Sequence, residues 1–173
     1  SASKTECQTC AAGQYAENRG MTECLPCSKG SYVSEEGATE CTLCPLGTYA
    51  VTEGTSQCTS CPASTTTDSR GMYEASACQC PAGTYEGSDG NCFSCPEGMS
   101  CAFGSRYVDI AEYASDSSLV IPLVEPGYFT LASDPLSVYY CEEGNEDTCP
   151  GGAPQTCSGG LTGLVCEVCP EGQ

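Results

Sequence analysis

Cysteine is the residue type through which this chain could do chemistry. It occurs 18 times in 173 residues, mostly in pairs separated by two residues, such as Cys24 with Cys27 and Cys41 with Cys44. Paired thiols of this kind hold zinc, exchange electrons as a redox dithiol, or close structural disulfides. The rest of the sequence decides among the three, because zinc and redox chemistry both need particular surroundings.

Zinc and redox chemistry are poorly supported by the remaining residues. Two successive Cys-x2-Cys pairs have nearly the spacing of a zinc ribbon, so a zinc-binding protein is one alternative. A reactive thiolate needs positive charge or a helix start nearby, whereas the chain has only five Lys and Arg and no His. Hydrolysis usually needs a histidine as the general base, and the chain has none. We therefore expect structural disulfides, no catalytic residues, no enzyme activity, no cofactor and no metal.

The charge and the cysteine content restrict the partners and the compartment. A formal net charge of −18 repels nucleic acid and anionic lipid. Disulfides persist in oxidising surroundings, so we expect an extracellular or cell-surface location, or another oxidising lumen. The longest apolar run, residues 119–124, is too short to span a bilayer. The final residues, 169–173, resemble the start of another repeat, so we expect the chain to belong to a longer, possibly membrane-anchored, protein or complex.

The cysteine pairs recur with a period of 17 residues, so a repeated structural unit must position them. The first cysteine of each pair falls at 7, 24, 41 and 58, and the second at 10, 27, 44 and 61. Glycines at 13, 30 and 47 and tyrosines at 15, 32 and 49 keep the same phase. The spacing changes after residue 61, and residues 76–80 depart from it. We expect tandem repeats over 1–101 that contact mainly their neighbours.

Each repeat is expected to contain short strands and a glycine turn. Glycine three residues after a cysteine suits a turn with positive φ, and proline directly after a cysteine fixes φ beside it. Stretches such as Gly-Thr-Tyr favour strands. The expected fold is small and disulfide-rich: an elongated rod of repeats with two-stranded β ladders and little helix.

The simplest disulfide pattern joins the ends of each repeat, and interleaved pairing between neighbouring repeats is the alternative. The end-to-end pattern leaves Cys7 for an upstream partner. A crosslink that closes about 15 residues contributes about 3 kcal/mol, which offsets the sparse apolar core. The expected pairs are Cys10–Cys24, Cys27–Cys41, Cys44–Cys58, Cys61–Cys78, Cys80–Cys92 and Cys95–Cys101.

The arrangement C-x2-C-P-x-G-T-Y…G-x3-C-x2-C, seen from Cys41 to Cys61, resembles the ephrin-receptor-like cysteine-rich repeats. It is also similar to the simplest modules of tumour-necrosis-factor receptor ectodomains. The resemblance covers residues 7–101 and implies an extracellular architecture in a large cell-surface protein. It carries over no ligand-binding residues, because the shared positions are structural.

Residues 102–140 contain no cysteine and hold most of the apolar density. Short runs of β-forming residues divided by prolines predict a β-rich unit of three or four strands, with a helical turn near 109–114. Its tyrosines serve either as core or as a partner-binding face, and core is favoured. Residues 141–173 form a third, cysteine-rich segment that resembles an epidermal-growth-factor module. There we pair Cys141–Cys149 and Cys157–Cys166 and leave Cys169 for a partner beyond the end.

Two further candidate sites are expected to be weak. Four acidic residues between two cysteines could contribute to a calcium site, although a solvated acidic loop is the simpler interpretation. A run of threonines could carry O-linked sugar. The residues are Glu142, Glu143, Glu146 and Asp147 for calcium, and Thr65, Thr66 and Thr67 for glycosylation.

The sequence thus favours a non-catalytic extracellular module that interacts with proteins or with copies of itself. We expect a disulfide-stapled spacer, or a subunit of a cell-surface or filamentous assembly. The alternatives are a receptor ectodomain fragment that binds a basic protein ligand, a lumenal subunit of a membrane complex, and a zinc-binding protein.

Overall fold

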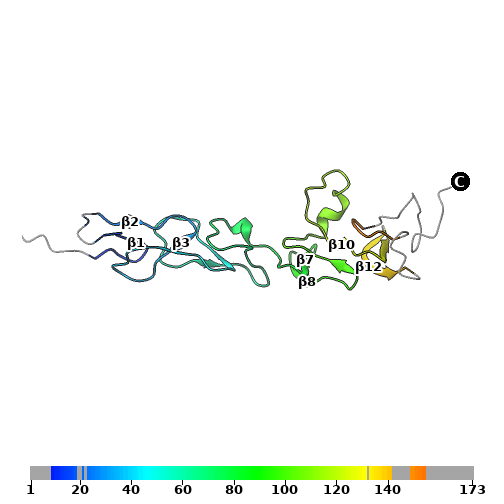
Figure 1. The fold of residues 1–173 in the computed structure, drawn as a ribbon, viewed down its shortest axis with the longest axis horizontal. Coiled ribbons are helices and arrows are strands. Elements are labelled where there is room, and N and C mark those ends of the chain that lie inside the picture. The colour runs from blue at the N-terminus through cyan, green and yellow to red at the C-terminus, as the bar shows by residue number, and fades with distance from the viewer. Residues whose placement is uncertain (1–8, 19–20, 22, 132, 142–148, 155–173) are drawn as a thin grey trace, which may run out of the picture. The chain divides into compact units, whose positions relative to one another are not determined.

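The computed structural model describes residues 9–18, 21, 23–131, 133–141 and 149–154, and it divides into two compact units, Ser1–Gln79 and Cys80–Gln173 (Figure 1). The division falls between Cys78 and Cys80, where the sequence departs from its 17-residue period. The boundaries expected at 101 and 140 mark changes in cysteine usage and stay a prediction, as does the elongation of the whole chain.

The first unit is a series of three two-stranded antiparallel ladders, as expected from the repeats. The first strand of each ladder contains the repeat tyrosine, and the second consists of the two residues between the cysteines of the next pair. The pairs are β1 (Gln14–Tyr15) with β2 (Leu25–Pro26), β3 (Ser31–Tyr32) with β4 (Thr42–Leu43), and β5 (Thr48–Tyr49) with β6 (Thr59–Ser60).

The fourth repeat keeps this pairing in reduced form. Thr66 and Gln79 exchange backbone hydrogen bonds of 2.9 and 2.8 Å across an isolated bridge. A single 3-10 turn, η1 (Ala75–Ala77), lies in its lengthened loop. The bridge shows that one residue between two cysteines is enough to hold the ladder register.

The glycine turn has the predicted conformation. In the third repeat the N–H of Thr48 donates to the carbonyl of Pro45 at 3.2 Å, with Gly47 between them at φ +75°. The third position of such a turn needs positive φ, which glycine adopts without strain. The hydroxyl of Thr48 donates to the same carbonyl at 2.8 Å, which explains why a hydroxyl residue follows the glycine.

The second unit contains the remaining strands. β7 (Thr84–Glu86) pairs with β8 (Cys92–Ser94), and β9 (Met99–Ser100) pairs with β10 (Leu123–Val124). β11 (Tyr128–Leu131) pairs with β12 (Asp134–Tyr140) through a register shift at Thr130/Leu131. The 3-10 turn η2 (Val108–Ala111) lies close to the helical turn expected near 109–114.

The apolar core is small and centres on sulfur. Phe129 packs with Cys141 and Cys149, and Leu131 covers this cluster. Two of the tyrosines expected in the core are instead on the surface, because Tyr139 is 36% and Tyr140 61% exposed. Tyr139 and Tyr140 are adjacent in β12 and point to opposite faces, so neither face of this two-stranded sheet is fully covered at this end of the strand.

Candidate functional site

The described cysteines form seven disulfides, and all seven are predicted pairs. None of them joins neighbouring repeats in the interleaved pattern. Seven disulfides account for all the cysteines in the described residues. No group of three or more Cys, Asp or Glu in the same ranges could hold a metal ion. Cys7, Cys169 and the predicted Cys157–Cys166 pair lie outside the described residues. The disulfides are Cys10–Cys24, Cys27–Cys41, Cys44–Cys58, Cys61–Cys78, Cys80–Cys92, Cys95–Cys101 and Cys141–Cys149.

These disulfides take the place of a core within each repeat. Cys27 and Cys44 are fully buried, whereas their partners Cys41 and Cys58 are half-buried. Because each of these disulfides has one buried cysteine, it both restricts the unfolded chain and fills volume in the interior of the repeat. The repeat is therefore stabilised around its own sulfurs.

Backbone hydrogen bonds join each repeat to the next, in an inter-repeat pattern that recurs every 17 residues. Gly13 N–H donates to the carbonyl of Val33 at 2.8 Å, and Gly37 N–H donates to the carbonyl of Cys10 at 2.8 Å. The same bonds recur one period later, from Gly30 to Ala50 and from Gly54 to Cys27, at 2.9 and 2.8 Å. Successive repeats thus satisfy each other's buried peptide groups.

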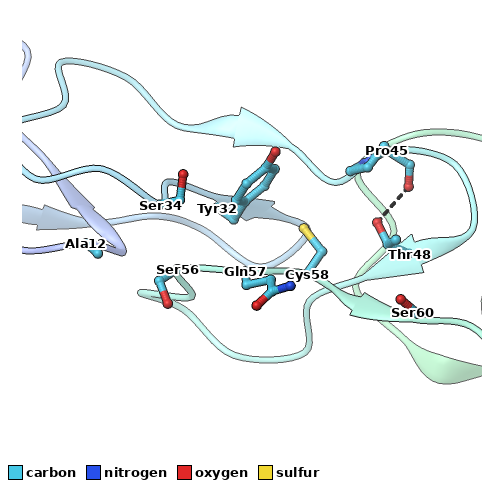
Figure 2. Close-up of a pocket in the computed structure, with 9 residues that line it drawn as sticks. All are labelled: Ala12, Tyr32, Ser34, Pro45, Thr48, Ser56, Gln57, Cys58 and Ser60. Atoms are coloured by element: carbon cyan, nitrogen blue, oxygen red, sulfur yellow. Dashed lines mark hydrogen bonds between the residues drawn. The ribbon is translucent and has the colours of Figure 1, made fainter.

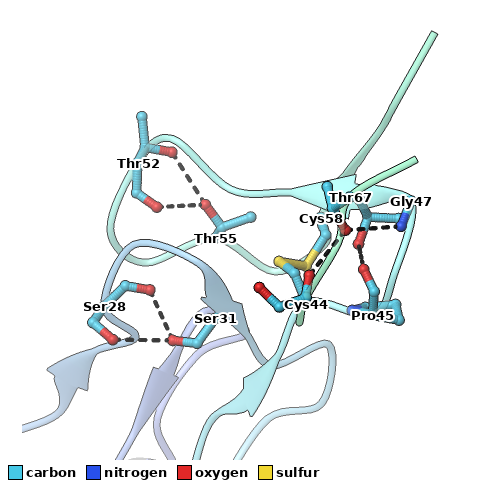
Figure 3. Close-up of a disulfide and its surroundings, with 11 residues drawn as sticks. Ser28, Ser31, Cys44, Pro45, Gly47, Thr52, Thr55, Cys58 and Thr67 are labelled. Atoms are coloured by element: carbon cyan, nitrogen blue, oxygen red, sulfur yellow. Dashed lines mark hydrogen bonds between the residues drawn. A yellow bond between two sulfur atoms is a disulfide. The ribbon is translucent and has the colours of Figure 1, made fainter. Parts of the chain in front are cut away.

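At one position of this inter-repeat pattern, a side-chain oxygen accepts the hydrogen bond in place of a backbone carbonyl. The equivalent N–H of Gly47 donates to the hydroxyl oxygen of Thr67 at 3.1 Å, and that hydroxyl donates to the carbonyl of Ser69 at 2.9 Å (Figure 3). Thr67 is 2% exposed. Its hydroxyl therefore serves as an internal link between the third and fourth repeats.

Replacing Thr67 with valine will lower the stability of the first unit by about 1–3 kcal/mol. Valine keeps the shape but leaves the N–H of Gly47 and the carbonyl of Ser69 without their partner. Chemical denaturation with the disulfides intact measures the loss. Thr65→Val is the matched control, because the Thr65 hydroxyl bonds only its own turn, to the carbonyl of Pro62. Equal losses for the two variants would contradict the linking role.

The same geometry bears on the two weak candidate sites. The buried and hydrogen-bonded hydroxyl of Thr67 is not accessible for glycosylation in the folded chain, whereas Thr65 and Thr66 are half-buried. Glycosylation at those two residues stays a prediction. The predicted calcium residues, 142, 143, 146 and 147, lie outside the described residues.

Glycines from repeats two apart meet back to back, which sequence reasoning missed. A Cβ added to Gly13 would lie 2.0 Å from the carbonyl oxygen of Gly54, and one added to Gly30 would lie 2.1 Å from that of Gly71. Gly13 and Gly30 belong to the series 13, 30 and 47, and Gly54 and Gly71 belong to a second series, 20, 37, 54 and 71, with the same period. The two series alone do not show which repeats meet. Only a residue without a side chain fits this approach.

The charged groups of the second unit stabilise local structure. Arg106 contacts Glu86 at 3.1 Å and Asp109 at 3.4 Å. The Asn91 side chain and then its N–H hold the pKa of Asp89 below its usual value, and Ser118 does the same for the pKa of Asp116. Burial, with smaller effects of Tyr107 and Asp89, raises the pKa of Tyr85. Hydrogen bonds within tight turns cause both carboxylate shifts.

An open groove of about 530 Å³ lies on the first unit (Figure 2). Tyr32 and Ser34 border it from the second repeat, and a stretch ending in Cys58 borders it from the third. In Figure 2, Ser56 and Gln57 lie below Tyr32, and Pro45 and Thr48 lie to its right.

Comparison with known families accounts for the first unit. Residues 1–40 and 30–78 match the model of the family described as tyrosine-protein kinase ephrin type A/B receptor-like. No curated protein matches the chain. With its disulfides and its antiparallel ladders, this part of the chain is similar to an ephrin-receptor-like cysteine-rich module. Neither 3-10 turn in the described ranges, nor any other helix there, has the length and apolar character for crossing a membrane.

Proposed function

We propose that this chain, whose residues 1–78 are an ephrin-receptor-like cysteine-rich module, is a non-catalytic spacer or subunit of a cell-surface or filamentous assembly. It works in an extracellular or other oxidising compartment, and it contacts proteins or copies of itself.

The backbone hydrogen bonds between successive repeats carry this proposal. Each described repeat of the first unit uses its own disulfide for internal stability and its glycine and cysteine peptide groups to bind the next repeat. Such an arrangement fixes the distance and orientation from one repeat to the next. A spacer needs repeats that keep a fixed distance and orientation from one to the next. The excess of acid keeps such a poorly cored chain soluble.

Solution measurements on the secreted, oxidised chain test the role. We expect every described cysteine to resist alkylation without reductant, and either concentration-dependent self-association or a monomer whose frictional ratio exceeds that of a compact 17.8 kDa protein. Light scattering and sedimentation velocity measure both properties. The fully reduced chain is the control for the contribution of the disulfides.

Two outcomes would overturn the proposal. A compact monomer that titrates a basic protein with one-to-one stoichiometry would favour a ligand-binding receptor fragment. Alkylatable thiols, together with zinc that a chelator removes, would favour the zinc-binding alternative. Either result is distinct from the expected behaviour, so the experiment separates the three functions.

A further inference from the structure

We propose that the groove on the first unit binds a neutral carbohydrate of one or two sugar units. It is lined by Ala12, Tyr32, Ser34, Pro45, Thr48, Ser56, Gln57, Cys58 and Ser60. None of these residues is charged, in a chain with a formal net charge of −18. The volume of about 530 Å³ lies in the ~300–1,000 Å³ range of small-molecule sites.

The polar groups of the groove are available to a ligand. The structure records no hydrogen bond from the side chains of Ser34, Ser56, Gln57 and Ser60 to another described residue. The Thr48 hydroxyl donates to its own turn and keeps its acceptor capacity. Hydroxyl and carboxamide groups both donate and accept, which matches the hydroxyls of a sugar.

An aromatic ring supplies the apolar part of the site. Tyr32 is half-buried and stands between the polar residues of the second and third repeats (Figure 2). A tyrosine ring offers a flat apolar face together with a polar edge, so it can receive the C–H face of a sugar ring. One ring surrounded by neutral hydroxyls favours a carbohydrate over an anion or a metal ion.

The internal repeat shows that this chemistry is not needed by the scaffold. The residue before the closing cysteine is Glu23 and Glu40 in the first two repeats, but Gln57 in the third. The position two residues after the tyrosine changes in the same way, from Glu17 to Ser34. A groove one period earlier would therefore present two carboxylates in place of two neutral groups.

A third equivalent position points the same way. The residue before the second cysteine of each Cys-x2-Cys pair is Pro26 and then Leu43, but Ser60 at the groove. The cysteines, glycines and tyrosines stay constant over the same repeats. The scaffold is thus held fixed while the groove residues become neutral and hydrogen-bonding, and this inference does not rest on the spacer role.

Saturation-transfer NMR on the oxidised full chain tests the site. The probes are maltose, cellobiose, lactose and α-1,2-mannobiose at millimolar concentration. We expect transfer to at least one of them, with a Kd on the order of millimolar, as befits a small ligand in an open site. Tyr32→Leu should weaken binding about tenfold because it removes the aromatic face, and Gln57→Glu about fivefold because it replaces the amide N–H donors with a charged acceptor.

Equivalent positions in neighbouring repeats provide matched controls. Tyr15→Leu removes a ring with the same structural role as Tyr32, and Glu40→Gln is the counterpart of Gln57→Glu, so both should bind like the unmodified chain. Chemical denaturation establishes that all four variants are folded.

Three outcomes would overturn the inference. The first is no transfer to any of the disaccharides. The second is transfer that persists unchanged in Tyr32→Leu and Gln57→Glu. The third is binding of a proline-rich peptide at the groove with none of the sugars competing, which would assign it to an extended peptide.

Discussion

Replacing Gly30 with alanine will destabilise the first unit by about 2–5 kcal/mol. Gly30 has φ +78°, where a side chain costs about 1–2 kcal/mol. In addition, the new Cβ would lie 2.1 Å from the carbonyl oxygen of Gly71, which is backbone and cannot rotate away. Overpacking of this kind typically costs a further 1–3 kcal/mol. Denaturant unfolding with the disulfides intact, followed by tyrosine fluorescence, measures the change.

Gly47→Ala isolates the second contribution. Gly47 occupies the same repeat position at φ +75°, but a Cβ there would meet only the Thr66 hydroxyl, at 3.5 Å. We expect it to cost about 1–2 kcal/mol, since only the backbone conformation is disfavoured. Equal losses for Gly30→Ala and Gly47→Ala would show that the close approach of Gly30 and Gly71 is not present in solution.

Removing the Cys44–Cys58 disulfide will have a comparably large effect. The bond closes a loop of about 15 residues, so its loss should cost about 3 kcal/mol from the entropy of the unfolded chain. Replacing both cysteines with alanine also empties the buried position of Cys44, which adds a cavity cost. Hydrogen exchange is the sharper readout: the N–H of Gly71, which donates to the carbonyl of Cys44 at 2.9 Å, should lose protection.

A change in the same loop that leaves the disulfide intact provides the control. Val51 is 49% exposed, and Val51→Ser should alter stability by less than about 0.5 kcal/mol. Retained protection of Gly71 in the Cys44→Ala, Cys58→Ala variant would mean that the hydrogen-bond ladder, and not sulfur, holds the repeats.

The sequence predicted the content of a repeat because its determinants are local. Gly47 with positive φ and the strand that contains Tyr49 each follow from a few neighbouring residues. The period of 17 then implies that every repeat is built alike. Joining Cys44 with Cys58 needs only the further assumption that a repeat closes on itself.

The contacts between repeats could not be predicted in the same way. The hydrogen bond from Gly30 to Ala50 and the approach of Gly30 to Gly71 depend on the pitch of the stack, which no local pattern encodes. The role of Thr67 was hidden for a related reason, since a hydroxyl there replaces a carbonyl used elsewhere. The groove is likewise visible only after Tyr32 and Gln57 are placed together.

The back-to-back glycines have a consequence for the smallest piece that can fold. Gly13 meets Gly54, and Gly30 meets Gly71, so the first repeat is coupled to the third and the second to the fourth. Free energy in this array is therefore not a sum over adjacent pairs alone, as it is in simpler solenoids. An excised segment of two repeats would lack these contacts altogether. Insertion of one complete 17-residue repeat would keep both glycine series in phase, so equivalent contacts could form between repeats two apart.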